Sequence, residues 1–167
     1  MAKKLPDFDT LVPLYPGDGF TADIVKRMIG GSVDSKDIDD TCIVRISKPL
    51  NYSGHPIPAW TEPFRTRKGR DNKWYGLRVK EFWPYMIKTY GQPTVFSKAP
   101  IARKSFSGIR GIIGFRVPFR DGSATGHFTL WDGERLLYGG SQHDYFSIAT
   151  EAALWEAGNI RTYTPEV

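Results

Sequence analysis

The chain has few of the residues from which most metal sites and disulfides are built. Its 167 residues include a single cysteine, Cys42, and three histidines. One cysteine cannot form an internal disulfide, and a zinc site needs several Cys or His ligands. A metal site would require His55, His127 and His143 to converge, so we expect no metal and no organic cofactor.

Long apolar runs are missing as well. No run approaches the ~20 residues that a membrane-spanning helix needs. Lys3 and Lys4 are not followed by the apolar stretch of a secretory signal peptide, so we expect synthesis in the cytoplasm without such a signal. Hydrophobic residues (40%) and charged residues (25%) occur at the levels of an ordinary globular protein. We therefore expect one folded domain over residues 1–167.

The charge balance is modestly basic. Lys and Arg number 23 against 18 Asp and Glu, a formal charge of +5. This excess favours an anionic partner, such as nucleic acid, a membrane surface or cell-wall polymer. The basic stretch from Arg65 to Lys73 would either hold substrate carboxylates or form a solvated loop, and we adopt the second interpretation. The aromatic residues do not alternate with basic ones as in single-stranded nucleic-acid platforms.

The first half of the chain has helical patterns. We expect a short helix capped by Thr21 and stopped by Gly30. The acidic cluster of residues 34–40 precedes a second helix, which has Cys42 in its first turn and is bounded by Pro49 and Gly54. A third helix starts at residues 79–82, where Pro84 would lie in its first turn, and ends at Gly91.

The second half indicates an antiparallel sheet. Residues 112–117 and 126–131 read as strands, and Asp132-Gly133 is typical of a two-residue turn into a return strand at residues 135–138. Residues 147–156 suggest a last helix, stopped by Gly158. Helices followed by an antiparallel sheet predict the α+β class.

Cys42 is either a small buried residue or a nucleophile. A helix N-terminus lowers the pKa of a thiol, which favours the reactive thiolate, and an imidazole nearby would complete the pair. His127, at the head of a predicted strand beside Gly126, is the best candidate. His55 and His143 lie in loops and are expected to be solvated. Cys42 and His127 therefore form the candidate catalytic pair.

Several segments resemble, in order, the blocks of one known family. They are residues 40–47 (Asp-Thr-Cys-Ile-Val-Arg-Ile-Ser), 51–58 (Asn-Tyr-Ser-Gly-His-Pro-Ile-Pro), 73–75 (Lys-Trp-Tyr) and 126–133 (Gly-His-Phe-Thr-Leu-Trp-Asp-Gly). The family is the fourth group of type VI secretion amidase effectors. The resemblance extends from residues 29–31 to Leu154-Trp155, nearly the whole chain.

This resemblance implies a papain-like, NlpC-type α+β fold, with a helical N-terminal part packed on an antiparallel sheet. It implies cleavage of the γ-D-glutamyl–meso-diaminopimelate bond in peptidoglycan stems, with Cys42 as nucleophile and His127 as general base. The backbone N–H of Cys42 is the expected oxyanion donor. The implied partners are a cognate immunity protein and the type VI apparatus, which would deliver the protein to the periplasm of a target bacterium.

The family also has an aspartate after the histidine strand, and its counterpart here is less obvious. A two-residue turn at 132–133 would place Tyr138, not a carboxylate, opposite His127. Asp144 matches if residues 139–143 are an insertion, and we select it as the third catalytic residue. Asp132 is the alternative. A neutral side chain or a backbone carbonyl would take this part if neither aspartate does.

Two other functions stay open at this point. The same Cys42–His127 pair could serve a different papain-like amidase or a transferase. A basic module that binds nucleic acid or glycan, with an inert Cys42, is the other. Arg45, one turn after Cys42, would pair either with a substrate carboxylate or, as we expect, with the acidic cluster of residues 34–40.

Overall fold

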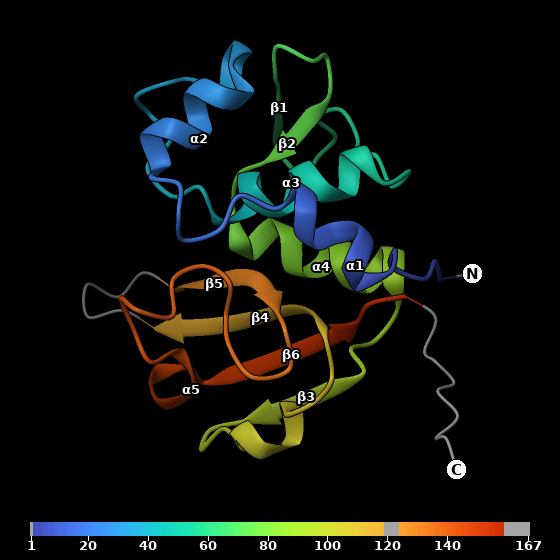
Figure 1. Cartoon of the computed structure of the whole chain (residues 1–167), viewed down its shortest axis with the longest axis vertical. Helices are drawn as coiled ribbons and strands as arrows, with labels where there is room; N and C mark the ends of the chain where they lie inside the picture. The colour runs from blue at the N-terminus through green and yellow to red at the C-terminus, as the bar shows by residue number, and fades with distance from the viewer. Residues whose placement is uncertain (1, 119–123, 159–167) are drawn as a thin grey trace.

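A helical layer and a sheet layer make up the computed structural model, which describes residues 2–118 and 124–158 (Figure 1). Residues 1, 119–123 and 159–167, which the predicted domain includes, lie outside the described part. The helices are α1 (Phe8–Leu11), α2 (Ala22–Ile29), α3 (Cys42–Tyr52), α4 (Val79–Tyr90) and α5 (Tyr145–Ile148). The strands are β1 (Thr66–Lys68), β2 (Trp74–Gly76), β3 (Val95–Lys98), β4 (Gly111–Pro118), β5 (Ala124–Trp131) and β6 (Glu151–Glu156).

The main sheet has the order β3-β6-β4-β5, and all of its neighbouring strands are antiparallel. Strand β5 lies at one edge, where Phe115 of β4 pairs with His127. Helices α1, α3 and α4 lie on one side of this sheet and α5 lies at the other (Figure 1). The α+β class and the helical layer on an antiparallel sheet are therefore confirmed.

Three helices begin where the sequence predicts. The Thr21 side chain accepts the Ile24 N–H at the start of α2, and Cys42 is the first residue of α3. Of the two predicted bounds of α3, Pro49 is wrong, because it lies inside the helix, whereas the end at Tyr52 lies just before Gly54. Pro84 is likewise inside α4, beyond its first turn. Burial of the apolar faces keeps both helices intact although each proline removes one backbone hydrogen bond.

The predicted helix at residues 147–156 is wrong. Only a short helix, α5, precedes strand β6, in which Ala152 pairs with Phe115 and Ala153 with Gly114. Strand β6 is central and has its middle residues buried on both faces, so its side chains do not alternate between apolar and polar. Two alanines in such a run resemble a helix, and the sheet overrides their helix propensity.

The basic stretch is not a solvated loop. It contains strand β1 and the turn that leads to β2, and Thr66 of β1 pairs with Gly76 of β2. Arg65 donates from Nε to the Glu81 carboxylate at 2.9 Å, and Arg67 forms an ion pair with Asp37. Two arginines of the stretch thus form ion pairs with carboxylates of the chain. The partner of Arg67, Asp37, belongs to the acidic cluster of residues 34–40.

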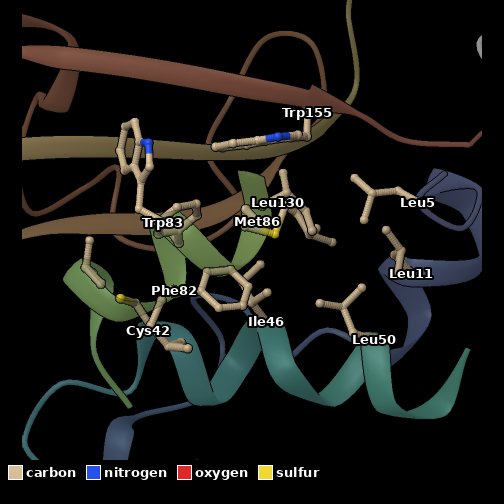
Figure 2. Close-up of a cluster of buried hydrophobic side chains, with 14 of the residues drawn as sticks. Leu5, Leu11, Cys42, Ile46, Leu50, Phe82, Trp83, Met86, Leu130 and Trp155 are labelled. Atoms are coloured by element: carbon tan, nitrogen blue, oxygen red, sulfur yellow. The ribbon is translucent and has the colours of Figure 1, made fainter. Parts of the chain in front are cut away.

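A continuous core fills the space between α3, α4 and the sheet. Phe82 of α4 contacts Phe128 of β5 edge to face, with ring centroids 5.0 Å apart, and Trp83 contacts the same ring. Figure 2 shows Cys42 at the start of α3, at one end of this cluster and close to Phe82. Packing in this core therefore holds the start of α3 close to β5. No helix in the described ranges is long and apolar enough to cross a membrane.

Phe82→Ala should lower the free energy of unfolding by about 3–5 kcal/mol, because it leaves a cavity at the contact between α4 and β5. Phe96→Ala is the matched control, since Phe96 is 47% exposed. It should cost less than about 0.5 kcal/mol. Urea unfolding followed by tryptophan fluorescence measures both values, and equal losses would contradict this account of the core.

Candidate active site

Cys42 occupies the first position of α3, with Thr41 as the N-cap residue. Its side chain is 1% exposed. The Cys42 N–H donates to Oδ1 of Asp40 at 2.9 Å. The predicted oxyanion donor is thus occupied by a carboxylate of the chain in this structure.

His127 lies on β5 and is 4% exposed. Its Nε2 lies 2.7 Å from the backbone oxygen of Tyr138. A carbonyl can only accept, so Nε2 carries the proton, and in the neutral ring Nδ1 has a free lone pair. The ring of Tyr145 stacks on the imidazole, with centroids 4.4 Å apart and an interplanar angle of 4°. One face and one edge of the imidazole are thus held by the chain.

The structure brings Cys42 to the strand that carries His127. The backbone of Phe128, the residue next to His127, lies close enough to the sulfur to act against the rise in the pKa of the thiol. Tyr145, which stacks on His127, also lies close enough to Cys42 for a thiolate there to raise the pKa of the tyrosine. His55 is elsewhere, with its Nδ1 2.9 Å from the Tyr90 hydroxyl. Of these two histidines, the fold therefore places His127, and not His55, near the cysteine.

Burial keeps both groups neutral in this structure. It raises the pKa of the Cys42 thiol well above its usual value, and the negative charge of Asp40 adds to the effect. Burial also lowers the pKa of His127 from 6.5, while the Tyr138 carbonyl and the charges of Asp40 and Asp18 oppose the shift. The predicted lowering of the thiol pKa is wrong, because loss of water around the sulfur outweighs the helix terminus. The resting pair is a thiol beside a neutral imidazole.

Asp144 is not placed against His127. It is exposed at the N-cap of α5, and its carboxylate caps no helix N–H. Asp132 accepts the backbone N–H groups of Glu134 and Arg135 at 2.8 and 2.7 Å, so it is a turn residue. Among the described residues, the hydrogen bond to the His127 ring comes from the carbonyl of Tyr138.

The turn after β5 explains this outcome. Its two loop residues are Gly133 and Glu134, because the Asp132 N–H donates to the Arg135 oxygen, so the turn lies one residue further along the chain than predicted. The return segment pairs through a bridge between Trp131 and Leu136. It then brings Gly139 (φ +89°) against the imidazole, where a Cβ would lie 2.6 Å from Nε2. Only glycine suits that position, for its backbone conformation and for the space beside the ring.

Arg45 is fully buried, and it forms no ion pair with the acidic cluster of residues 34–40. It donates to the Thr41 hydroxyl and to two backbone oxygens, and its guanidinium lies over the Tyr138 ring. Asp18 is a second residue that the sequence pattern did not indicate. Its Oδ1 accepts the Gly139 N–H at 2.9 Å across 121 positions of the chain. The place of Asp40, two residues before Cys42, indicates a hydrogen-bond acceptor for the Cys42 N–H. No neighbouring sequence pattern indicates Asp18 or the Tyr138 carbonyl.

A cleft of about 530 Å³ adjoins this arrangement. Tyr145 and Asp18 line it, and these two residues also act on His127. Its charged lining includes both signs: Arg103, Arg135, Asp18 and Asp144. In the described part of the chain, no three His, Cys, Asp or Glu side chains gather as metal ligands would.

The start of α3 packed on β5 of an antiparallel sheet, with Cys42 and His127 at the contact, is the arrangement of a papain-like, NlpC-type α+β protein. A family model of type VI secretion system (T6SS) amidase effector protein 4, Tae4, matches residues 38–155. The chain belongs to this family of amidase effectors, which are hydrolases that a type VI system delivers to target bacteria.

Solved structures of the family are similar over nearly the whole chain. The type VI effector Tae4 from Enterobacter cloacae is 27% identical, with a TM-score of 0.82, and the alignment covers 95% of this chain and 100% of that one. Tae4 in the effector–immunity system Tae4/Tai4 from Salmonella typhimurium is 26% identical, with a TM-score of 0.80 and coverage of 92% and 99%. No curated protein sequence matches the chain.

The burial of Cys42 predicts its reaction with iodoacetamide. At pH 6 we expect alkylation slower than that of a free thiol with a pKa of ~8.5, because the buried thiol holds its proton. The rate should rise with pH beyond pH 8.5, as more thiolate forms. Mass spectrometry of the intact protein measures it. Fast, pH-independent labelling at pH 6 would show a thiolate–imidazolium pair instead.

Proposed function

We propose that the protein is a cysteine amidase that cleaves the γ-D-glutamyl–meso-diaminopimelate bond of peptidoglycan stems. The observation that carries the proposal is the contact between Cys42 and the strand of His127, in a chain of the amidase effector 4 family. Residues 1–167 act as one amidase domain in this proposal. Asp144 is left out of the catalytic set because no hydrogen bond joins its carboxylate to His127 in the described part of the chain.

The neutral pair suits general-base catalysis. Nδ1 of His127 accepts the thiol proton as the Cys42 sulfur attacks the amide carbonyl. The imidazolium then protonates the departing amine, which leaves a thioester on Cys42. A water molecule, deprotonated by the same imidazole, hydrolyses this thioester and restores the thiol. Since the pKa of His127 is lowered by burial, the ring remains a base at pH values slightly below 6.5.

The cleft beside Tyr145 is the proposed substrate site. Peptide stems carry carboxylates and, at diaminopimelate, an amino group, so a lining with both signs of charge complements them. Cys42 and His127 are nearly fully buried, so a substrate carbonyl reaches the sulfur only after the side chains over the pair move aside. Substrate binding and exposure of the pair are coupled in this proposal.

Digestion of purified peptidoglycan tests the bond and the pair together. The protein should release fragments whose masses show cleavage between D-glutamate and diaminopimelate. Cys42→Ala and His127→Ala should each reduce product at least about 10³-fold, as removal of a nucleophile or its base does in hydrolases. Mass spectrometry of the muropeptides measures this.

Asp144→Asn is the matched comparison. It should keep kcat within about twofold of the unaltered chain, because an exposed carboxylate without a hydrogen bond to His127 does not orient the ring. Its effect should be confined to KM, since Asp144 lines the proposed substrate cleft. Cleavage at another bond would favour a different amidase. An uncleaved wall, with strong salt-dependent binding to DNA, would favour the binding module.

The place of action gives a second test. Assembled wall lies outside the inner membrane, so the protein should harm a bacterium only when it is fused to a periplasmic export signal. Growth and lysis are followed for exported and unexported forms. Cys42→Ala in the exported form should remove lysis. Equal toxicity with and without export would indicate a cytoplasmic target. In a separate experiment, co-expression of a cognate immunity protein should protect the cells that export the protein.

A further inference from the structure

Arg45 is a fully buried cation without an ion pair among the described residues, which is rare in folded proteins. Its guanidinium has no carboxylate partner among the described residues, and its Nη2 is buried without a hydrogen bond. Burying an unpaired charge is costly, so the contacts that it does make must hold it in place. Those contacts connect α3 to Tyr138, whose carbonyl accepts the hydrogen bond from His127.

The first set of contacts joins α3 to residues 16–18. Nε of Arg45 donates to the Thr41 hydroxyl at 2.9 Å. Nη1 donates to the backbone oxygens of Pro16 and Gly17 at 3.1 and 2.8 Å. The guanidinium therefore fixes the backbone of a segment that has no regular secondary structure of its own.

The second set joins that segment to the return segment after β5. The Asp18 N–H donates to the Leu137 oxygen at 3.0 Å, and Oδ1 of Asp18 accepts the Gly139 N–H at 2.9 Å. A Cβ on Gly17 would lie 2.6 Å from the same Leu137 oxygen, so only glycine allows this approach. Both neighbours of Tyr138 are thus tied to the segment that Arg45 holds.

The third contact is direct. The Arg45 guanidinium carbon lies 3.6 Å from the centre of the Tyr138 ring, a distance at which a cation and an aromatic face attract each other. The carbonyl of Tyr138 is the group bonded to Nε2 of His127. Arg45 therefore fixes the ring of this residue, and the backbone on either side of it through residues 16–18.

We propose that Arg45 is a positioning residue of the Cys42–His127 pair: it holds the Tyr138 carbonyl on Nε2 of His127 and so keeps Nδ1 free for the thiol. The carbonyl orients the imidazole without a carboxylate. This inference rests on the proposed function for its effect on turnover, whereas the orientation of the ring is a property of the chain alone.

The planar contact distinguishes Arg45 from any other cation. Arg45→Lys keeps the charge but loses the flat stack on Tyr138 and the fork to residues 16 and 17. Tyr138→Leu keeps the backbone carbonyl but removes the ring, and Tyr138→Phe keeps both. Arg110→Lys is the matched control, since Arg110 also lies over a ring, that of Phe8 at 5.0 Å, away from the site.

The test has two readouts on the full chain. Nitrogen-15 NMR of the histidine rings reports the tautomer, with the His127 signals assigned by comparison with His127→Ala. Steady-state kinetics on a soluble muropeptide, below the unfolding temperature of every variant, separates kcat from KM. In the unaltered chain, the His127 signal should be that of a single tautomer protonated at Nε2.

Arg45→Lys and Tyr138→Leu should give mixed tautomers of His127 and a kcat lowered about tenfold or more, with KM within about twofold, because a misplaced base slows chemistry rather than binding. Tyr138→Phe should keep the single Nε2-protonated tautomer, because it keeps both the carbonyl and the ring, and Arg110→Lys should match the unaltered chain in both readouts. A single Nε2-protonated tautomer in Arg45→Lys and Tyr138→Leu would overturn the inference, whatever their kcat. If the unaltered chain cleaves no muropeptide, the proposed function fails, and the tautomers still decide the role of Arg45.

Discussion

The contact between the start of α3 and strand β5 is the constraint on which the site depends. Phe82 and Trp83 pack on Phe128, and this burial brings the backbone of Phe128 to the Cys42 sulfur. Because His127 precedes Phe128, a hydrophobic contact sets the distance between the two reactive groups. The same burial removes water from both, which keeps the thiol protonated and the imidazole neutral. Packing and protonation are therefore consequences of one interface.

Local patterns in the sequence were sufficient for the elements that carry the pair. The acidic residues before Cys42 marked the start of α3, and the apolar run around His127 marked β5. Helix α4 and strand β4 were equally plain. Strand β6 was mistaken for a helix because a central strand covered on both faces shows no alternation, so its alanines had no strand signal. The β1–β2 hairpin was hidden by arginines whose acidic partners lie far along the chain.

The surroundings of His127 could not be read in the same way. The group on Nε2 is a backbone oxygen, the alternative to an aspartate, and because every residue type supplies one, no sequence pattern indicates which residue it belongs to. Whether the Tyr138 carbonyl reaches the ring depends on the position of the turn, whose loop residues are 133–134, and on Asp18, 121 positions away from its partner Gly139. Arg45 was expected to form an ion pair with a carboxylate. It is buried instead against the backbone carbonyls of Pro16 and Gly17 and the ring of Tyr138.

The carbonyl on His127 has a consequence for acid tolerance. A carboxylate that orients an imidazole loses its charge when it is protonated, so such a site has two groups that acid can disable. A peptide oxygen does not titrate in this range and keeps its dipole at any pH in which the chain is folded. The tautomer of His127 is therefore insensitive to acid until the imidazole itself takes a proton. No carboxylate on Nε2 titrates together with the imidazole, so the acidic limit of the pair is set by the ring and by the charges of Asp40 and Asp18 that act on it.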